Sequence, residues 1–195
     1  MNATCVLTHD RLLAQARDPS SNLTHAFAGV LARFRTLGLD RDQLIRVLER
    51  YFPGGTSLAE VLPAIEAGCP AFRADEISDV LELLLSYRAD DSEETVWLAH
   101  AMATACLGDN HLWQDMGLSH RDALSDLLRR HFTALYDKNT GNMKWKKFFY
   151  KHLCERAEVN LCRAPSCQVC IDYAKCFGSE DGVGDIISTT SRERT

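Results

Sequence analysis

Apolar residues recur with a helical period through most of this 195-residue chain, from about residue 20 to residue 157. A period of this kind, interrupted by turn residues, is typical of amphipathic helices that bury one face. The chain has no internal repeat and no alternating strand pattern of any length. The sequence therefore predicts an all-α fold: a bundle of about six helices, followed by a C-terminal cysteine-rich loop segment that binds metal.

Boundary signals agree with this interpretation. Asp40 and Ser92 are suitable N-caps, and Ser119 with Asp122 resembles a capping box. Gly38 and Gly108 are predicted helix ends. The six predicted helices contain the stretches Leu23 to Phe34, Leu44 to Tyr51, Glu76 to Tyr87, Glu93 to Cys106, Leu124 to Leu135 and Met143 to Ala157.

Charge and hydropathy exclude two function classes. The formal net charge of −5 argues against a general nucleic-acid binder, which needs a basic face to neutralise phosphates. No stretch approaches the roughly 20 apolar residues of a membrane span, so we expect no membrane insertion. The N-terminal residues lack a basic start followed by an apolar run, which predicts no signal peptide and a cytoplasmic protein.

Four of the eight cysteines lie within fifteen residues, in the stretch CRAPSCQVCIDYAKCFG: Cys162, Cys167, Cys170 and Cys176. In a compartment that keeps thiols reduced, such a group is more often a metal site than a disulfide framework. The first three cysteines have the spacing that opens the plant-type ferredoxin pattern. Structural zinc usually uses two separate Cys-x-x-Cys pairs, and only one is present. The spacing favours an iron–sulfur cluster, with zinc and reduced or regulatory thiols as alternatives.

The preceding stretch, MKWKKFFYKHLCE, is a basic amphipathic helix. Its aromatic residues share one face, while Lys144, Lys147 and Lys151 project from another. A solvated basic face is one interpretation of these lysines. The other is that they stabilise a negatively charged thiolate site and attract anions to it.

Three stretches in this order, GDNHLWQDMGL, MKWKKFFYKHLCE and CRAPSCQVCIDYAKCFG, resemble the NifQ family of nitrogen-fixation proteins. The resemblance covers residues 108–178. It implies an iron–sulfur protein that takes up molybdenum and supplies it for synthesis of the iron–molybdenum cofactor of nitrogenase. The family's cysteine motif maps onto Cys162, Cys167, Cys170 and Cys176, and the implied partners are molybdate or a molybdenum-storage source and the nitrogenase cofactor-assembly proteins.

Weaker candidates surround this motif. His111 is a candidate molybdenum ligand, or else a packing and hydrogen-bonding residue. Cys154 is a candidate additional ligand, although a cysteine on an amphipathic helix is more often a small buried hydrophobe. Lys146 and Lys147 are predicted to attract molybdate, because an oxyanion with two negative charges needs local positive potential to approach thiolates.

The predicted organisation is a helical scaffold over residues 1–157, a cluster-binding segment packed on it over 158–180, and a disordered tail over 181–195. A carrier and assembly protein needs no turnover chemistry, so we expect that the chain is not an enzyme. The alternative function is a zinc-stabilised helical module for protein–protein interaction.

Overall fold

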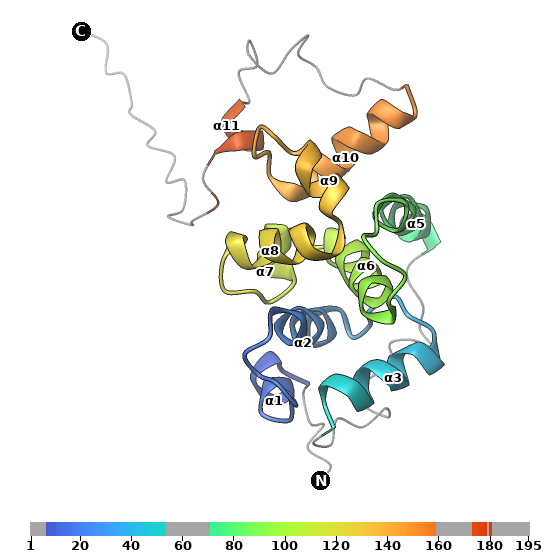
Figure 1. Ribbon diagram of the computed structural model, residues 1–195, viewed down its shortest axis with the longest axis vertical. Coiled ribbons are helices and arrows are strands. Elements are labelled where there is room, and N and C mark those ends of the chain that lie inside the picture. The colour runs from blue at the N-terminus through green and yellow to red at the C-terminus, as the bar shows by residue number, and fades with distance from the viewer. Residues whose placement is uncertain (1–6, 54–70, 159–172, 179, 181–195) are drawn as a thin grey trace, which may run out of the picture.

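The computed structural model describes residues 7–53, 71–158, 173–178 and 180, with only the backbone of 71–74. These residues form ten helices and no strand (Figure 1). The helices are α1 (His9–Leu13), α2 (Asn22–Phe34), α3 (Arg41–Tyr51), α5 (Ala71–Ser86), α6 (Glu93–Cys106), α7 (Leu112–Asp115), α8 (Arg121–His131), α9 (Thr133–Lys138), α10 (Trp145–Arg156) and α11 (Tyr173–Phe177). The prediction of an all-α fold is confirmed for this part of the chain.

The six helices that the sequence predicts correspond to α2, α3, α5, α6, α8 and α10. The prediction of about six helices is too low for the described residues, because α1, α7 and α11 were not expected and α9 was expected only as the end of the fifth helix. Each of these four has no more than six residues. So short a helix shows too little of the 3.6-residue period to be detected in the sequence.

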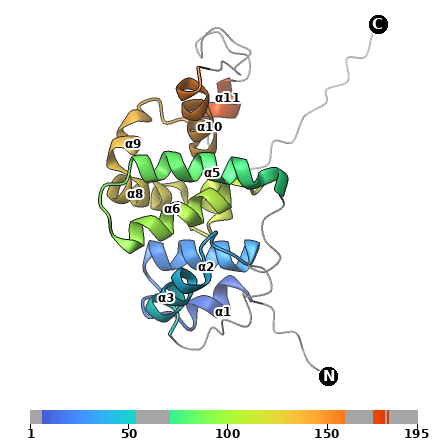
Figure 2. The same cartoon turned by 90° about the vertical axis from the view of Figure 1, so that its right-hand side faces the viewer.

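Helix α6 is the centre of the bundle. It contacts α2, α5 and α7. Figure 2 shows α6 between α2 and α5. From Trp97 onward every residue of α6 except His100 is buried, and Trp97, Leu98 and Met102 are among the most enclosed side chains. A helix that is buried on all sides must be the core around which amphipathic helices pack.

Two local predictions of caps are confirmed. Asp40 accepts a hydrogen bond from the backbone N–H of Gln43 at 2.8 Å, and the Gln43 side chain accepts one from the Asp40 N–H at 3.3 Å, which makes a complete capping box. Ser92 Oγ accepts the N–H of Thr95 at the start of α6. In each cap the two hydrogen-bonded residues are only three positions apart, so the sequence alone is enough to predict the cap.

The ends of α2 and α8 differ from the prediction. Helix α2 ends at Phe34, where Arg35 adopts a left-handed conformation with φ of 63°, and not at Gly38. The N-cap of α8 is His120, whose Nδ1 accepts the N–H of Ala123 at 3.1 Å, and not Ser119. An imidazole nitrogen replaces the expected hydroxyl in the same capping geometry.

The predicted fifth helix, which was to run to Leu135, is broken at Phe132 into α8 and α9. The His131 carbonyl accepts a hydrogen bond from the N–H of Ala89, at 2.8 Å, in the loop after α5. This carbonyl would otherwise accept the N–H of Leu135 in a continuous helix. The Leu135 N–H bonds to the Phe132 carbonyl instead. A tertiary contact thus stops the helix where the apolar pattern would continue it.

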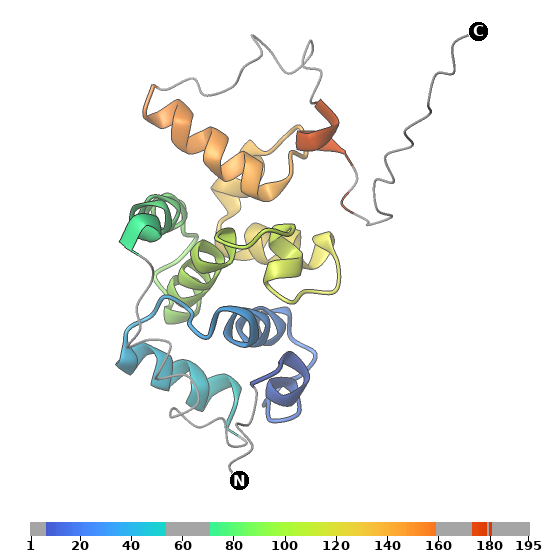
Figure 3. The same ribbon diagram turned by 180° about the vertical axis from the view of Figure 1, so that it is seen from behind.

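Helices α10 and α11 lie at one end of the molecule, opposite α1 and α3 (Figure 3). Trp145, Phe148 and Phe149 on α10 are buried and join the same hydrophobic core as the other helices. In the part of the chain that the structure describes, no helix is long and apolar enough to cross a membrane.

Candidate functional site

The three stretches that carry the family resemblance meet around one cavity of about 400 Å³. The loop before α7 contributes Asp109, Asn110 and His111, the start of α10 contributes its lysines, and the C-terminal segment contributes Lys175 and Glu180. The full lining is Gly108, Asp109, Asn110, His111, Leu112, Gln114, Lys144, Trp145, Lys146, Lys147, Lys175 and Glu180. Stretches far apart in the sequence therefore form one local surface.

Of the four predicted cysteine ligands, the structure describes Cys176 only. It lies on α11, is half-buried and has a free thiol. Cys162, Cys167 and Cys170 lie outside the described residues. Among the residues that are described, no three His, Cys, Asp or Glu side chains are grouped to hold a metal ion.

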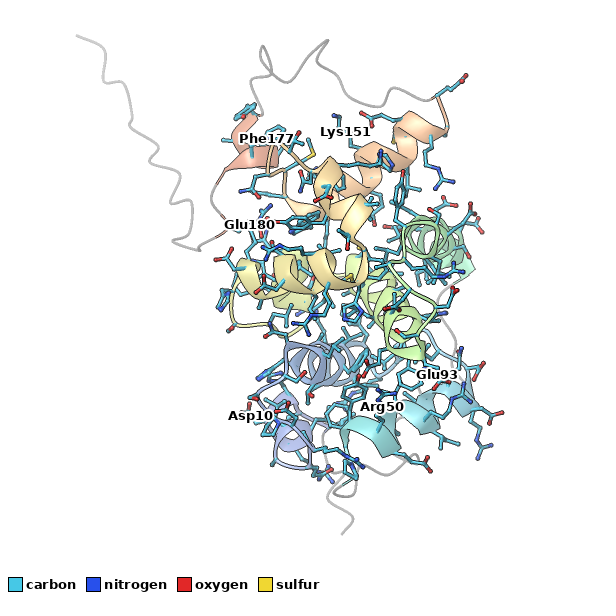
Figure 4. The ribbon with its side chains drawn as sticks, in the orientation of Figure 1. Asp10, Arg50, Glu93, Lys151, Phe177 and Glu180 are labelled. Carbon is cyan, nitrogen blue, oxygen red and sulfur yellow. The ribbon has the colours of Figure 1, made fainter. Side chains whose placement is uncertain are left out.

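Helix α11 is attached to the start of α10 through its backbone. The Lys144 N–H donates to the Cys176 carbonyl at 2.8 Å, and Lys144 Nζ lies 3.4 Å from the Ala174 carbonyl. Tyr173 and Phe177 stack on each other with ring centroids 4.4 Å apart, and Phe177 packs against the core. Figure 4 shows Phe177 on α11 and Lys151 on the neighbouring α10. The last predicted ligand is thus held at a fixed place on the bundle.

Glu180 makes a second attachment just after the cysteine segment. Its side chain is buried and forms an ion pair with Arg121 at the start of α8. The same guanidinium donates to Asn142 Oδ1 at 2.9 Å and to the Met143 carbonyl at 2.8 Å. Arg121 therefore joins α8, the turn before α10 and the end of the cysteine segment. The predicted tail, residues 181–195, lies outside the described residues.

Lys146, one of the two lysines predicted to attract anions, forms an ion pair with Asp115. Lys146 Nζ lies 2.6 Å from Asp115 Oδ2 and 2.7 Å from the Gly108 carbonyl. Asp115 is completely buried and also receives Arg33 Nε at 3.1 Å and the side-chain amide of Asn110 at 3.0 Å. Most of the Lys146 charge is therefore compensated inside the protein, and its role in attracting anions stays a prediction.

Lys147 has a different environment from its neighbour. It is exposed, it lines the cavity, and it has no ion pair with any residue that the structure describes. Lys151, one turn further along α10, is paired with Glu155 at 3.2 Å and lines another cavity. The three lysines of one helix thus differ in how far their charge is available to a ligand.

His111 is the N-cap residue of α7 and lines the cavity. Its backbone N–H donates to Gln114 Oε1 at 3.1 Å, and its Nδ1 lies 3.9 Å from Glu180 Oε2. The ring is about one third exposed. The structure brings His111 to the same surface as α11, which is compatible with either interpretation of this residue.

Cys154 is half-buried on α10. At a rise of 1.5 Å per residue, it lies roughly 15 Å along the helix axis from Lys144, where α11 is attached.

Cys106 at the end of α6 is almost fully buried, and this burial raises the pKa of its thiol to about 12. Cys106 is thus part of the hydrophobic core, where burial disfavours the thiolate form.

Sequence reasoning missed Asp115, Arg33, Arg121 and Glu180 as parts of this site. The stretch GDNHLWQD contains Asp115, but nothing in the sequence of that stretch indicates that its carboxylate will be buried. Arg33 and Arg121 are separated from their partners by 82 and 59 residues respectively. No signal in a single sequence pairs residues at such distances.

Comparison with known proteins shows the family of the chain. The model of the NifQ family matches residues 19–178. Protein NifQ of Azotobacter vinelandii is 41% identical over 152 residues, which cover 74% of this chain and 78% of that protein. Protein NifQ of Rhodobacter capsulatus is 35% identical over 162 residues, which cover 83% of this chain and 86% of that protein.

A NifQ homolog of Sinorhizobium fredii is 36% identical over 164 residues, covering 80% of this chain and 66% of that protein. No solved structure matches. The family match includes all three stretches that surround the cavity as well as the four cysteines. The chain therefore belongs to the NifQ family, which is implicated in nitrogen fixation.

Proposed function

We propose that this chain is an iron–sulfur protein that takes up molybdenum and delivers it for synthesis of the iron–molybdenum cofactor of nitrogenase. Cys162, Cys167, Cys170 and Cys176 are the proposed thiolate ligands. Its proposed partners are molybdate or a molybdenum-storage source, and the nitrogenase cofactor-assembly proteins. In this role it works in the cytoplasm as a carrier and assembly site and needs no catalytic step of its own.

The observation that carries the proposal is the donor set, four cysteines within fifteen residues of a NifQ family member. Thiolates are the usual ligands of iron–sulfur clusters, and the first three cysteines have a ferredoxin-like spacing. The described part of the segment is compatible with this role. The Cys176 thiol is free and half-buried, and its backbone is held on α10 by Lys144.

Sulfur ligands explain why such a site suits molybdenum. Molybdate carries hard oxygen ligands, whereas thiolates and sulfides are soft donors. A bound cluster would supply the sulfides that replace oxygen around molybdenum. The contribution of the chain is to present the thiols and to hold the end of the cysteine segment at two points. Lys144 binds the Cys176 carbonyl, and Arg121 binds the Glu180 carboxylate.

Metal analysis of the full-length protein, purified without oxygen, tests the proposal. We expect iron and acid-labile sulfide in comparable amounts, a brown colour, and molybdenum bound after incubation with molybdate. Zinc without iron, sulfide or colour would contradict the proposal and support the zinc-stabilised interaction module.

Replacement of single cysteines identifies the ligands. Cys176→Ala should lower the iron content and bleach the charge-transfer absorption, because a missing thiolate leaves an iron open to solvent. Cys154→Ala is the matched control, since Cys154 is also a half-buried free thiol but lies at the far end of α10. Full iron content in Cys176→Ala, together with loss of iron in Cys154→Ala, would show that the proposed ligand set is wrong.

A further inference from the structure

The cavity between the loop before α7, the start of α10 and α11 has an excess of basic side chains. Four lysines line it, Lys144, Lys146, Lys147 and Lys175, against two carboxylates, Asp109 and Glu180. The whole chain has the opposite balance, with a net charge of −5. The lining of this cavity therefore has a local excess of positive residues in a chain that is acidic as a whole.

The internal ion pairs decide which of these charges face the cavity. Lys146 is compensated by Asp115, and Glu180 is compensated by Arg121. Lys147 has no ion pair with a described residue, and the contact of Lys144 Nζ is with a neutral backbone carbonyl. The remaining acidic group of the lining is Asp109. The cavity consequently keeps a positive potential after the pairs are formed.

The cavity also has the size and the polar groups that an anion requires. A volume of about 400 Å³ admits a small anion together with part of its water shell, since one water takes about 30 Å³ in the liquid. Asn110, His111 and Gln114 provide polar atoms among the lysines. In addition, Lys144 at the N-cap of α10 makes no side-chain cap, and a helix start without one adds a weak positive dipole.

We infer that this cavity binds a tetrahedral oxyanion with two negative charges. Lys147 and Lys144 make the main ionic contacts, and Lys146 shapes the site through Asp115. The identification of the anion as molybdate rests on the proposed function, in which the cavity binds molybdate beside the cysteine segment. No bond of the anion is made or broken at this stage, because binding here is electrostatic.

Equilibrium dialysis of the full-length protein against molybdate in low salt tests the inference. Lys147→Gln should weaken binding about thirtyfold, because a charge pair at ~4 Å contributes about 1 kcal/mol for each of the two charges of the anion, and roughly 1.4 kcal/mol is a factor of ten. Lys147→Arg should restore binding, since the charge returns. Tungstate and sulfate, which are also tetrahedral dianions, should compete with molybdate.

Lys151→Gln is the matched control, because it removes the same charge from the same helix but from a residue that is paired with Glu155 and lies outside this cavity. Unchanged binding in Lys147→Gln would overturn the inference, and so would an equal loss in Lys147→Gln and Lys151→Gln. Circular dichroism of each variant checks that the fold is kept.

Displacement of bound molybdate by other anions distinguishes a failure of this inference from a failure of the proposed function. Molybdate in the cavity should be displaced by excess sulfate or by salt, whereas molybdenum held on an iron–sulfur site should stay with the iron through desalting. Protein that contains iron but binds no exchangeable molybdate would overturn the cavity inference alone. Protein without iron that still binds exchangeable molybdate in a Lys147-dependent manner would overturn the proposed function alone.

Discussion

The ammonium of Lys146 lies 2.6 Å from the Oδ2 atom of Asp115, a carboxylate with no exposed surface. Arg33 from α2 and Asn110 from the loop before α7 bind the same carboxylate. Three segments of the chain are thus joined at one buried negative charge. Two of the residues bound to Asp115, Lys146 and Asn110, also line the cavity at the start of α10, so the junction helps to position that lining.

Replacing Asp115 should destabilise the fold more than any surface substitution near the cavity. Asp115→Asn presents an amide to Lys146 and Arg33, so that a largely buried ammonium loses its counter-charge. We expect a fall of about 3 kcal/mol in the free energy of unfolding, measured by urea denaturation. Lys147→Gln, on an exposed neighbour, should change it by less than about 0.5 kcal/mol.

A double-variant cycle completes this test. Lys146→Met combined with Asp115→Asn should be less destabilising than the sum of the two single changes, because the second change removes a charge that the first left without a partner. Additive effects would show that Lys146 and Asp115 do not stabilise each other.

The attachment at Glu180 predicts where the chain can be shortened. A chain that ends at Glu180 should keep the stability and metal content of the full-length protein, since the Arg121 pair remains. A chain that ends at Gly178 should be less stable by about 2 kcal/mol, because Arg121 is left largely buried without its carboxylate.

Glu180→Gln in the full-length chain is the companion of this truncation and should have the same effect on the thermal unfolding midpoint. If both shortened chains were as stable as the full-length protein, the pair of Arg121 and Glu180 would have no structural role.

Stability should fall as the pH drops below about 6.5. Burial lowers the pKa of His131, with the carboxylate of Asp90 opposing this effect in part. The unfolded chain therefore binds a proton to this residue more readily than the folded chain, so the contribution of His131 to stability is complete above its unfolded pKa and is lost as the pH falls. Burial also lowers the pKa of His100 and His152, which add to the same trend.

Urea denaturation between pH 7.5 and 5.5 measures this effect. His131→Gln, which keeps a hydrogen-bonding group near Thr95 Oγ1, should show a shallower dependence on pH than the natural sequence. An unchanged slope would mean that His131 is not a source of the acid sensitivity.

Asp90 contributes to the pH dependence at lower pH than the histidines. Hydrogen bonds from the Ser92 hydroxyl and backbone N–H lower the pKa of Asp90 to about 2, so its contribution to stability is lost between about pH 4 and pH 2.

The helical bundle should fold without any metal. Its largest fully buried side chains, among them Phe27, Trp97, Phe132 and Phe149, all precede the cysteine segment. A core of this size stabilises a domain without the help of a metal site. Far-UV circular dichroism before and after removal of metal by a chelator checks this expectation. Loss of most of the helical signal would show that the metal holds the bundle together.

Sequence reasoning found the features that depend on neighbours along the chain. The caps at Asp40 and Ser92 use partners three residues away, and the stripes of α2, α3, α5, α6, α8 and α10 repeat within each helix. It could not find the break at Phe132, because that depends on the N–H of Ala89 reaching the His131 carbonyl. The ligand roles of Cys162, Cys167, Cys170 and Cys176 stay predictions.

The sequence by itself determined that the chain is helical, that a basic helix precedes the cysteines, and that four cysteines lie within fifteen residues of one another along the chain. The tertiary structure alone decided how the lysines of that helix differ. Lys146 is bound to Asp115, which is 31 residues away, whereas Lys147 faces a cavity lined by three separate segments. Periodicity assigns residues to a face, but the effective charge of a side chain depends on which distant groups the fold brings within a few ångströms of it.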